Sequence, residues 1–555
     1  MTGTVDSLIK AGDHLSSRPY TKRSTRIVSL LDIDIPEHAT DEEYRHVYRC
    51  YTQTASPQDP SSNASLLRDA VESIKYGISP PVAFPTETVY GLGADATNEP
   101  ATSGIFAAKG RPSDNPLIVH AASISHLERV TGAPLPEVYK SVTEKFWPGP
   151  LTILLPVPSS SIFAKNVHPG QNTIGFRIPS SKYARFFIAA TDRPLAGPSA
   201  NSSGKPSPTT ARHVLDDLHG KINFILDGGS CDVGVESTVV DGLHDPPLIL
   251  RPGGVSLEEF RALGREVGGE NGDKWARTTI GYKMHRSGDK SPSSNTQGSP
   301  TNAITNGVSA RSTPLSESFT TTGTDGIASY EEDVNGAPRA PGMKYRHYAP
   351  RGRLILFSEE AFEAGRVAQK MDDIVDAAQS DFGILGREKK RAINIGIISC
   401  HWPPFAGLKD IAMTAIKSSE TLHNGSSEDL LAHSDYANAT STARIQHKDT
   451  VITLFNVRLG PETSTLAHSL FGVLRLFDDL DCTYIFAETV RRSGATPFAS
   501  SIPAHAAVNG EVTLGKERGD SRQARRDLED AVMDRIEKAA AERVDCVGTQ
   551  PEENE

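Results

Sequence analysis

The chain has 555 residues, which is too long for a single hydrophobic core, so two or three domains are expected. Its hydrophobic content is only 37%, and its 46 glycines and 37 prolines indicate folded domains diluted by segments that do not fold. The formal net charge of −11 excludes a generally basic nucleic-acid-binding protein, although a local cationic cleft stays compatible with it.

Cysteine spacing and hydropathy indicate a reducing, cytoplasmic compartment and no membrane partner. The five cysteines are far apart and match neither a disulfide framework nor a zinc motif. No apolar run approaches the roughly 20 residues that span a bilayer, and the N-terminus lacks the hydrophobic region of a signal peptide. Basic residues between Lys10 and Arg26 leave a targeting segment and a mitochondrial pool open, although Asp6, Asp13 and the acidic run 41–43 weigh against them.

The first predicted domain covers residues 63–268, after an N-terminal extension (1–62) that we expect to be largely irregular. Apolar residues recur at helical spacing over 63–76, and Gly77 offers a C-terminal stop. Short apolar strands then alternate with helical stretches, which predicts an α/β domain. The predicted strands are 82–84, 117–120, 151–155, 173–177, 222–226, 237–240 and 248–251, and the predicted helices include 135–146 and 209–218.

A second α/β domain is predicted at 353–544, between a linker and a short tail at 545–555. Residues 269–352 are expected to be a disordered linker, because most of them are too polar to offset chain entropy by burial. The linker ends in an aromatic and basic strip at 340–350. Polar insertions are expected at about 416–447 and 489–526. The predicted strands are 354–357, 393–399, 451–456 and 483–487, and the predicted helices are 359–378, 463–479 and 528–541.

The first domain contains a candidate anion cradle. The chain lacks a G-x-x-x-x-G-K-[ST] phosphate loop, an H-E-x-x-H zinc motif and a G-x-S-x-G elbow. Lys109 and Arg111 instead stand beside hydroxyls and exposed backbone amides, a combination that suits an anionic ligand. Five segments contribute to this candidate cradle: 85–93, 109–116, 173–179, 197–204, and 234–241 with 251–254.

Each segment alone also has a purely structural interpretation. A Gly-x-Gly turn is more often only a turn, a Lys-x-Arg pair is usually solvated, and His120 could be a satisfied core histidine. Arg177 and Arg251 are harder to explain structurally, because a charge on an apolar strand needs a partner or a ligand. The combination of five such segments in one domain is therefore the stronger signal.

Taken together, the segments closely resemble the threonylcarbamoyl-AMP synthase family in its long, two-domain form. FPTETVYGLG, KGRPSDNPL, WPGPLT, RIP, PSAN, ESTVVD, RPG and PGMKYRHYAP occur in the order expected for that family. The resemblance implies an α/β fold with a YrdC-like twisted mixed sheet and a concave cationic cleft. A smaller, Rossmann-like α/β domain would follow the linker.

The resemblance implies an enzyme, a nucleotidyltransferase that converts L-threonine, bicarbonate and ATP into threonylcarbamoyl-AMP, pyrophosphate and water, with Mg²⁺ accompanying ATP. The product would supply a threonylcarbamoyl-transfer complex that modifies the adenosine next to the anticodon of tRNA. The carbamate oxygen attacks the α-phosphate, so no enzyme nucleophile is needed. Catalysis is then expected to come from positioning and charge stabilisation.

Site residues carry over from the resemblance position by position. Threonine is expected to contact Thr86, His120, Arg177, Gly197 and Ser237, with Arg177 pairing with the carboxylate. ATP is expected to contact Lys109, Ser113, Asn115, Thr173, Ser199, Asn201, Ser207, Arg251 and Tyr345. Lys109 and Arg111 are expected to be the catalytic residues that neutralise phosphate charge, and no residue is assigned to a metal. The strip with Tyr345 is expected to act as a lid that excludes water.

Two other interpretations stay open. The same concave surface would suit a non-catalytic module that binds double-stranded RNA or tRNA, with steeply salt-dependent affinity and no ATP turnover. A carbamoyl-transfer or hydrolase enzyme would instead depend on carbamoyl phosphate. The C-terminal domain lacks G-x-G-x-x-G after a strand, so no cofactor is assigned to it.

Overall fold

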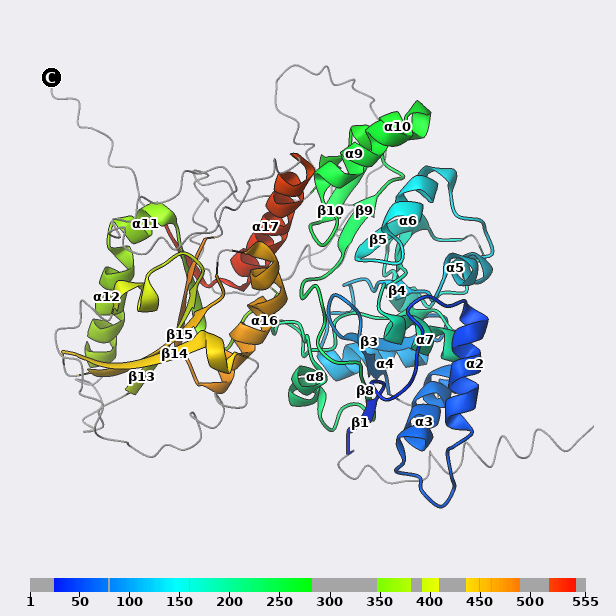
Figure 1. The fold of residues 1–555 in the computed structure, drawn as a ribbon, viewed down its shortest axis with the longest axis horizontal. Helices are drawn as coiled ribbons and strands as arrows, with labels where there is room; N and C mark the ends of the chain where they lie inside the picture. Colours follow the sequence, from blue (N-terminus) through cyan, green and yellow to red (C-terminus); the bar gives the residue numbers. More distant parts are fainter. Residues whose placement is uncertain are drawn as a thin grey trace, which may run out of the picture.

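The computed structural model describes residues 24–77, 80–158, 160–281, 347–380, 392–408, 436–448, 450–460, 462–489 and 519–545. These residues form two mixed α/β units that lie next to each other (Figure 1). The N-terminal unit is built on an 11-stranded sheet, and the C-terminal unit on a six-stranded sheet. In the described part of the chain, no helix is both long and apolar enough to cross a bilayer.

The N-terminal sheet has the order β1-β8-β2-β3-β7-β4-β6-β5-β9-β10-β11. It mixes parallel pairs such as β1–β8 with antiparallel pairs such as β2–β3, which confirms the predicted mixed sheet. The strands are β1 (Arg26–Ser29), β2 (Val82–Phe84), β3 (Gly91–Asp95), β4 (Val119–His120), β5 (Leu151–Pro156), β6 (Thr173–Arg177), β7 (Leu195–Ala196), β8 (Phe224–Asp227), β9 (Thr238–Asp241), β10 (Leu248–Arg251) and β11 (Thr279–Ile280).

Helices cover both faces of this sheet. Side chains alternate between the faces along each strand, so a strand with consecutive apolar residues has apolar side chains to bury on both. In β2, Val82 and Phe84 join the apolar cluster around α2, α3 and α7, whereas Ala83 belongs to the larger cluster on the opposite face. The helices are α2 (Asp41–Thr52), α3 (Asn63–Tyr76), α4 (Glu99–Lys109), α5 (Ile124–Thr131), α6 (Lys140–Phe146), α7 (Lys182–Thr191), α8 (Ala211–Leu218), α9 (Leu257–Val267) and α10 (Gly269–Ala276), with 3-10 turns at Glu137–Tyr139 and Lys165–Val167.

Two predicted boundaries of this unit are wrong. The unit begins before residue 63: β1 extends the sheet beside β8, and α2 packs on α7 after a capping box at Thr40. The start of the linker moves as well, because α10 and β11 occupy 269–280 and Trp275 is fully buried against Phe260. Residues 1–23 and 282–346, with Tyr345 and most of the predicted linker, lie outside the described residues.

The C-terminal unit confirms the prediction of a second, smaller α/β sheet. Its order is β14-β15-β13-β16-β12-β17, and β14 is antiparallel to its neighbour while the other pairs are parallel. The strands are β12 (Arg353–Phe357), β13 (Ala392–Ser399), β14 (Thr440–His447), β15 (Thr450–Arg458), β16 (Tyr484–Glu488) and β17 (Glu542–Val544). The helices are α11 (Glu359–Glu363), α12 (Arg366–Ser380), α16 (Thr463–Asp479) and α17 (Gly519–Ala539), with 3-10 turns at Pro404–Gly407 and Ala437–Ala439.

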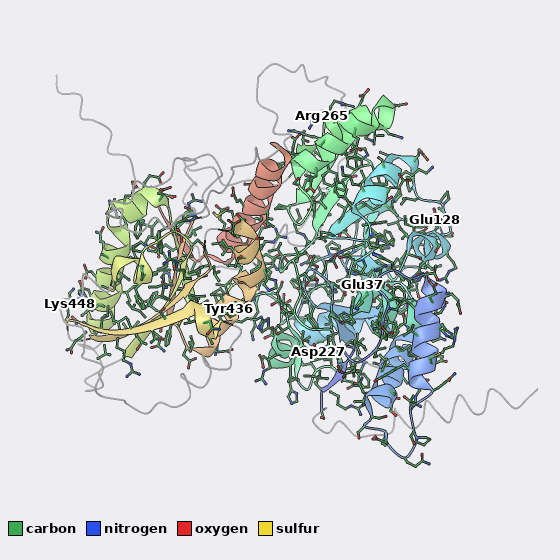
Figure 2. The ribbon with its side chains drawn as sticks, viewed as in Figure 1. Glu37, Glu128, Asp227, Arg265, Tyr436 and Lys448 are labelled. Atoms are coloured by element: carbon green, nitrogen blue, oxygen red, sulfur yellow. The ribbon has the colours of Figure 1, made fainter. Side chains whose placement is uncertain are left out.

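The first predicted polar insertion contains an edge strand. We expected 416–447 to be an insertion, but residues 440–447 form β14, in which Ile445 is the one fully buried residue. An edge strand tolerates polar side chains on both faces, so its sequence looks like a loop. The preceding segment packs on α16, where the Tyr436 hydroxyl donates to the Ser469 carbonyl at 3.4 Å (Figure 2).

Helices α16 and α17 lie on the side of the C-terminal unit that faces the N-terminal unit (Figure 1). The apolar cluster around them contains Leu470 and Phe471 from α16, and it also contains Val89 and Val235 from the N-terminal unit. Burial of these apolar side chains from both units in one cluster gives the junction a hydrophobic core. The C-terminal unit therefore packs directly against two segments of the N-terminal unit, the one that follows β2 and the one that precedes β9.

Candidate functional site

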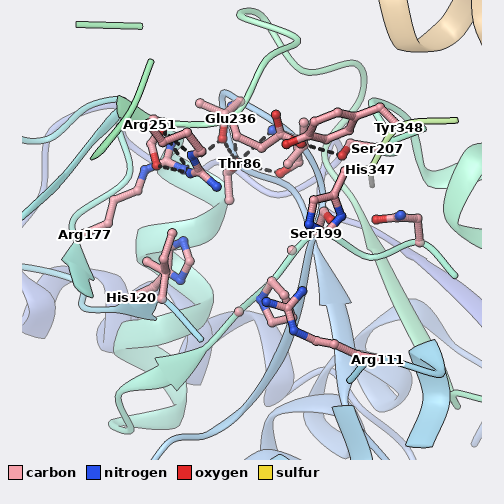
Figure 3. Close-up of a pocket in the computed structure, with 18 of the residues that line it drawn as sticks. Thr86, Arg111, His120, Arg177, Ser199, Ser207, Glu236, Arg251, His347 and Tyr348 are labelled. Atoms are coloured by element: carbon pink, nitrogen blue, oxygen red, sulfur yellow. Dashed lines mark hydrogen bonds between the residues drawn. The ribbon is translucent and has the colours of Figure 1, made fainter. Parts of the chain in front are cut away.

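A polar pocket opens in the N-terminal unit, beside the junction (Figure 3). All five segments of the predicted cradle contribute to its wall. The lining residues are Thr86, Thr88, Val89, Gly91, Arg111, Ile118, His120, Arg177, Gly197, Pro198, Ser199, Asn201, Lys205, Ser207, Glu236, Ser237, Arg251, His347 and Tyr348.

Arg177, the last residue of β6, is fixed from three sides. Its Nη2 lies 2.6 Å from Glu87 Oε1, its Nη1 donates to Thr88 Oγ1 at 2.8 Å, and its Nε donates to the Gly149 carbonyl at 3.2 Å. Thr88 Oγ1 is in turn 2.9 Å from Thr86 Oγ1. The guanidinium is therefore preorganised beside two hydroxyls, which is the geometry that a carboxylate ligand needs.

His120 lies next to this group, at the end of β4. Its ring meets Phe84 edge to face, with 5.8 Å between centroids. Burial, with a smaller contribution from Arg177, lowers the pKa of His120 to about 3. The imidazole is therefore neutral at physiological pH and adds no charge to the pocket.

Arg251 lies at the end of β10, on the same side of the pocket as Arg177 (Figure 3). Its Nη2 donates to the Ser237 carbonyl at 2.9 Å and to Ser237 Oγ at 3.2 Å, and Ser237 Oγ is also 2.8 Å from Thr152 Oγ1. Burial lowers the pKa of Arg251 from its ordinary value. The prediction that Arg177 and Arg251 face a common site is confirmed geometrically, since both line the pocket.

The KGRP segment divides its two cations between different tasks. Arg111 lines the pocket and donates to the Pro116 carbonyl at 2.9 Å. Lys109 is buried and is not among the lining residues: its Nζ donates to the backbone carbonyls of Ser199 and Asn201, the latter at 2.6 Å. Burial, followed by the nearby Arg111, lowers the pKa of Lys109 well below its ordinary value. Lys109 therefore braces the PSAN loop in this structure.

The predicted ATP contacts are only partly brought together. Ser199, Asn201, Ser207 and Arg251 line the pocket, but Ser113, Asn115 and Thr173 do not. Asn115 is buried, Ser113 is exposed, and Thr173 lines a separate small cavity beside Thr152 and Val239. The spacing of the motif could not reveal this, because α4 ends at the left-handed Gly110 (φ 64°) and tertiary packing sets the path of the loop after it.

Five of the lining residues that carry a polar side chain were not predicted as site residues: Thr88, Lys205, Glu236, His347 and Tyr348. The aromatic and basic strip was predicted to reach the site through Tyr345, but within the described part of the strip His347 and Tyr348 occupy the wall. Tyr348 adopts a left-handed conformation (φ 66°) and stacks on Phe471, with 5.1 Å between centroids. Burial lowers the pKa of His347 to about 4. The composition of the strip was the signal for these residues, and the contact predicted for Tyr345, which lies outside the described residues, stays a prediction.

Four cations line the pocket against a single lining carboxylate, Glu236: they are Arg111, Arg177, Lys205 and Arg251. Two of them are paired with carboxylates that do not line the pocket, Arg177 with Glu87 and Lys205 with Asp217. Low-dielectric walls strengthen the attraction of these cations for an anion. The fold and the site together define a two-domain α/β protein with a pocket for a small anionic ligand.

Comparisons with known proteins agree with this class. A family model described as "Telomere recombination" (Sua5_yciO_yrdC) matches residues 80–253, and the model for the threonylcarbamoyl-AMP synthase C-terminal domain matches 315–502. The threonylcarbamoyl-AMP synthase of Schizosaccharomyces pombe is 39% identical over 361 residues, which is 61% of this chain and 73% of the relative. The enzyme of Pyrococcus abyssi is 39% identical over 294 residues, covering 53% and 68% of the two chains.

Solved structures give the same result over the whole fold. The crystal structure of Pyrococcus abyssi Sua5 in complex with L-threonine aligns with a TM-score of 0.53 at 28% identity, covering 94% of this chain and all of that one. A variant of the same protein with an adjacent histidine and tyrosine replaced by alanine aligns with a TM-score of 0.52 at 26% identity, covering 95% of this chain and all of that one. The chain belongs to the threonylcarbamoyl-AMP synthase family, in the form that carries a C-terminal domain.

Proposed function

We propose that this chain is an L-threonylcarbamoyl-AMP synthase, which joins L-threonine, bicarbonate and ATP and releases pyrophosphate and water. Membership of the family supports the activity, and one observation in the structure carries the assignment of the site. This is the buried Arg177, preorganised beside Thr86 and Thr88 in a cationic pocket. Such a group is suited to the carboxylate of an amino acid.

The threonine half of the site follows from the groups around Arg177. The threonine carboxylate would pair with this guanidinium, and the hydroxyls of Thr86 and Ser237 and the neutral His120 would contact the rest of the amino acid. Gly197 leaves room there, because a Cβ on it would lie 3.0 Å from His120 Nδ1. The threonine amine would be carboxylated in this position, close to the nucleotide half.

The nucleotide half would lie along Arg111, Ser199, Asn201, Ser207 and Arg251. In the chemical step the carbamate oxygen bonds to the α-phosphorus of ATP while the bond to pyrophosphate breaks. Arg111, Lys205 and Arg251 are the lining cations that would stabilise the charge developing on the phosphates. Lys109 would contact phosphate only after leaving the carbonyls that it binds, so its first task is to hold the PSAN loop.

Mg²⁺ is proposed to enter as part of the nucleotide substrate. Glu236 is the one carboxylate among the lining residues, and it is already bound to Ser207 and Arg535. Within the described residues no group of three His, Cys, Asp or Glu is placed to hold a metal ion. The phosphate oxygens of ATP and water are therefore the expected ligands.

The product is proposed to supply a threonylcarbamoyl-transfer complex that modifies tRNA next to the anticodon. The mixed anhydride is labile, so a pocket closed by His347 and Tyr348 would protect it from water. Direct binding of double-stranded RNA or tRNA by this chain is a separate hypothesis. A steep loss of RNA affinity with salt, at concentrations where ATP turnover is unaffected, would support it.

Pyrophosphate release tests the proposal. The purified chain is given ATP, Mg²⁺ and bicarbonate, with and without L-threonine. We expect release that depends on threonine and is lost in Arg177→Gln. Arg212→Gln is the matched control, because Arg212 is an exposed arginine paired with Asp216 on α8 and should leave the rate unchanged. Release that is independent of threonine would contradict the proposal.

A further inference from the structure

Two buried arginines of the C-terminal unit reach into the N-terminal unit beside the pocket. Arg475 on α16 lies 3.0 Å from Asp217 on α8 and donates to the Pro206 carbonyl. Arg535 on α17 is completely buried, and its Nε lies 3.1 Å from Glu236 Oε2. Pro206 immediately precedes Ser207, so both contacts converge on the same stretch of pocket wall.

Glu236 has both carboxylate oxygens committed. Its Oε1 accepts a hydrogen bond from Ser207 Oγ at 2.5 Å, and its Oε2 faces Arg535. Burial acts to raise the pKa of Glu236, but Arg535, Arg251 and the bond from Ser207 outweigh it, and the pKa is lowered. The ionised carboxylate therefore accepts the proton of Ser207, which leaves the lone pairs of this hydroxyl for the pocket.

Arg535 is fixed in turn by its own helix and by the described end of the linker. Its Nη1 is 3.0 Å from Asp534 Oδ2, and its guanidinium carbon lies 5.9 Å from the centre of the Tyr348 ring. One guanidinium therefore lies against α17, the segment before β9 and Tyr348, an aromatic residue of the pocket wall. Arg535 itself is not among the lining residues, so any effect on a ligand passes through Glu236 or Tyr348.

We propose that Arg535 is a positioning residue for the nucleotide half of the site, through which the C-terminal unit orients Ser207 by way of Glu236. The inference rests on the proposed function, since it takes Ser207 as a nucleotide contact. Without Arg535, the buried Glu236 carboxylate loses its partner and protonates or shifts, and it no longer orders the Ser207 hydroxyl. A hydroxyl that presents lone pairs suits a donor of the nucleoside, such as a ribose hydroxyl or an amino group, rather than a phosphate oxygen.

The test separates the KM for ATP from the KM for threonine in pyrophosphate release by the full chain. We expect Arg535→Gln to raise the KM for ATP about tenfold, by analogy with loss of one buried hydrogen-bonded charge, and to leave the KM for threonine within about twofold. The KM for ATP of Arg535→Lys should lie between those of wild type and Arg535→Gln, because lysine keeps the charge but not the planar guanidinium. If Arg535→Gln does not fold, Arg535→Lys carries the same test.

A double-mutant cycle with Glu236→Gln tests whether Arg535 acts on Ser207 through Glu236. We expect Glu236→Gln to raise the KM for ATP, and adding Arg535→Gln to it to have little further effect, because both changes break the same connection. His468→Ala is the control for the junction: it removes an exposed hydrogen bond to the Asp232 carbonyl and leaves in place the side chains of Arg535, Glu236 and Ser207. An unchanged KM for ATP in Arg535→Gln, an equal rise in both KM values, or additive effects would each overturn the inference.

Direct ATP binding distinguishes this inference from the proposed function. The dissociation constant for ATP is measured by calorimetry in wild type and Arg535→Gln, without turnover. If wild type binds ATP but releases no threonine-dependent pyrophosphate, the proposed function fails, and weaker ATP binding in Arg535→Gln would still support the role of Arg535. If turnover is intact and ATP binding is unaltered in the variant, the role of Arg535 is contradicted.

Discussion

Arg177 and Glu87 form an ion pair inside the N-terminal unit, with 2.6 Å between Nη2 and Oε1 and only 4% and 5% of the two side chains exposed. The pair joins the end of β6 to the PTET turn after β2. Because the pair is buried, the desolvation penalty offsets much of its electrostatic attraction. Its contribution to the site is therefore to fix the orientation of the Arg177 guanidinium. Arg177 is held in place before threonine arrives.

Replacing Arg177 should therefore affect binding and stability together. We expect Arg177→Gln to raise the KM for threonine by more than about tenfold and to cost about 3–5 kcal/mol of unfolding free energy, since it leaves Glu87 buried without its partner. Arg177→Gln combined with Glu87→Gln should recover much of the stability but not the threonine affinity. Urea unfolding and steady-state kinetics measure both. Recovery of threonine affinity in the double variant would contradict the assignment of Arg177 to the carboxylate.

Gly197 should be needed for space rather than for backbone freedom. A Cβ there would lie 3.0 Å from His120 Nδ1 and 3.2 Å from Phe84 Cζ. Gly197→Ala should displace the imidazole and lower kcat/KM for threonine about tenfold or more, since small shifts at a reacting centre are costly. Gly104→Ala on α4 is the matched control, with its Cβ 3.1 Å from Pro81 Cδ and away from the pocket. Equal activity in both variants would exclude a role for this gap.

His120 should make the protein less stable in acid. Burial lowers the pKa of His120 to about 3 from an ordinary 6.5, so between these values the unfolded chain binds a proton that the folded chain does not. The stability due to neutral His120 is fully present above pH 6.5 and is lost progressively as the pH falls toward 3. In His120→Gln the urea midpoint should depend less on pH over this range. Some dependence should remain from His213, because burial also lowers the pKa of His213 to about 3. An identical pH profile in wild type and His120→Gln would contradict this.

Tyr348 should matter for protecting the product more than for making it. Its ring stacks on Phe471 at the pocket wall. Tyr348→Phe should keep this contact and retain most of the activity, whereas Tyr348→Ala should open the site to water. The measurement is the ratio of intact threonylcarbamoyl-AMP to released pyrophosphate. We expect the ratio to fall in Tyr348→Ala; an unchanged ratio with slower turnover would assign Tyr348 to catalysis rather than to shielding.

The sequence predicted the parts of this protein that have strong local patterns. Strands 82–84 and 173–177 and helix 463–479 match β2, β6 and α16 residue for residue, because buried strands and amphipathic helices have clear periods. It missed β1 and β14, which are edge strands with one buried side chain each. It also missed α10, whose buried Trp275 stacks on Phe260 of the preceding helix, a contact that the local pattern does not reveal.

The site was predicted where motif residues point into the pocket and missed where the fold redirects them. Arg177, His120 and Arg251 end strands that share one edge of the sheet, so their convergence could be anticipated. Lys109 could not be placed, because the carbonyls that it binds lie about 90 residues away in sequence. Arg535 could not be found at all: its contact with Glu236 joins two domains across 299 residues.

The most direct test of the central claim is detection of the product. The chain is incubated with ATP, Mg²⁺, bicarbonate and carbon-labelled L-threonine, and labelled adenylate and pyrophosphate are measured together at early times. We predict one labelled threonylcarbamoyl-AMP for each pyrophosphate and neither product without bicarbonate. Pyrophosphate released with no label joined to AMP would contradict the assignment of this pocket to threonylcarbamoyl-AMP synthesis.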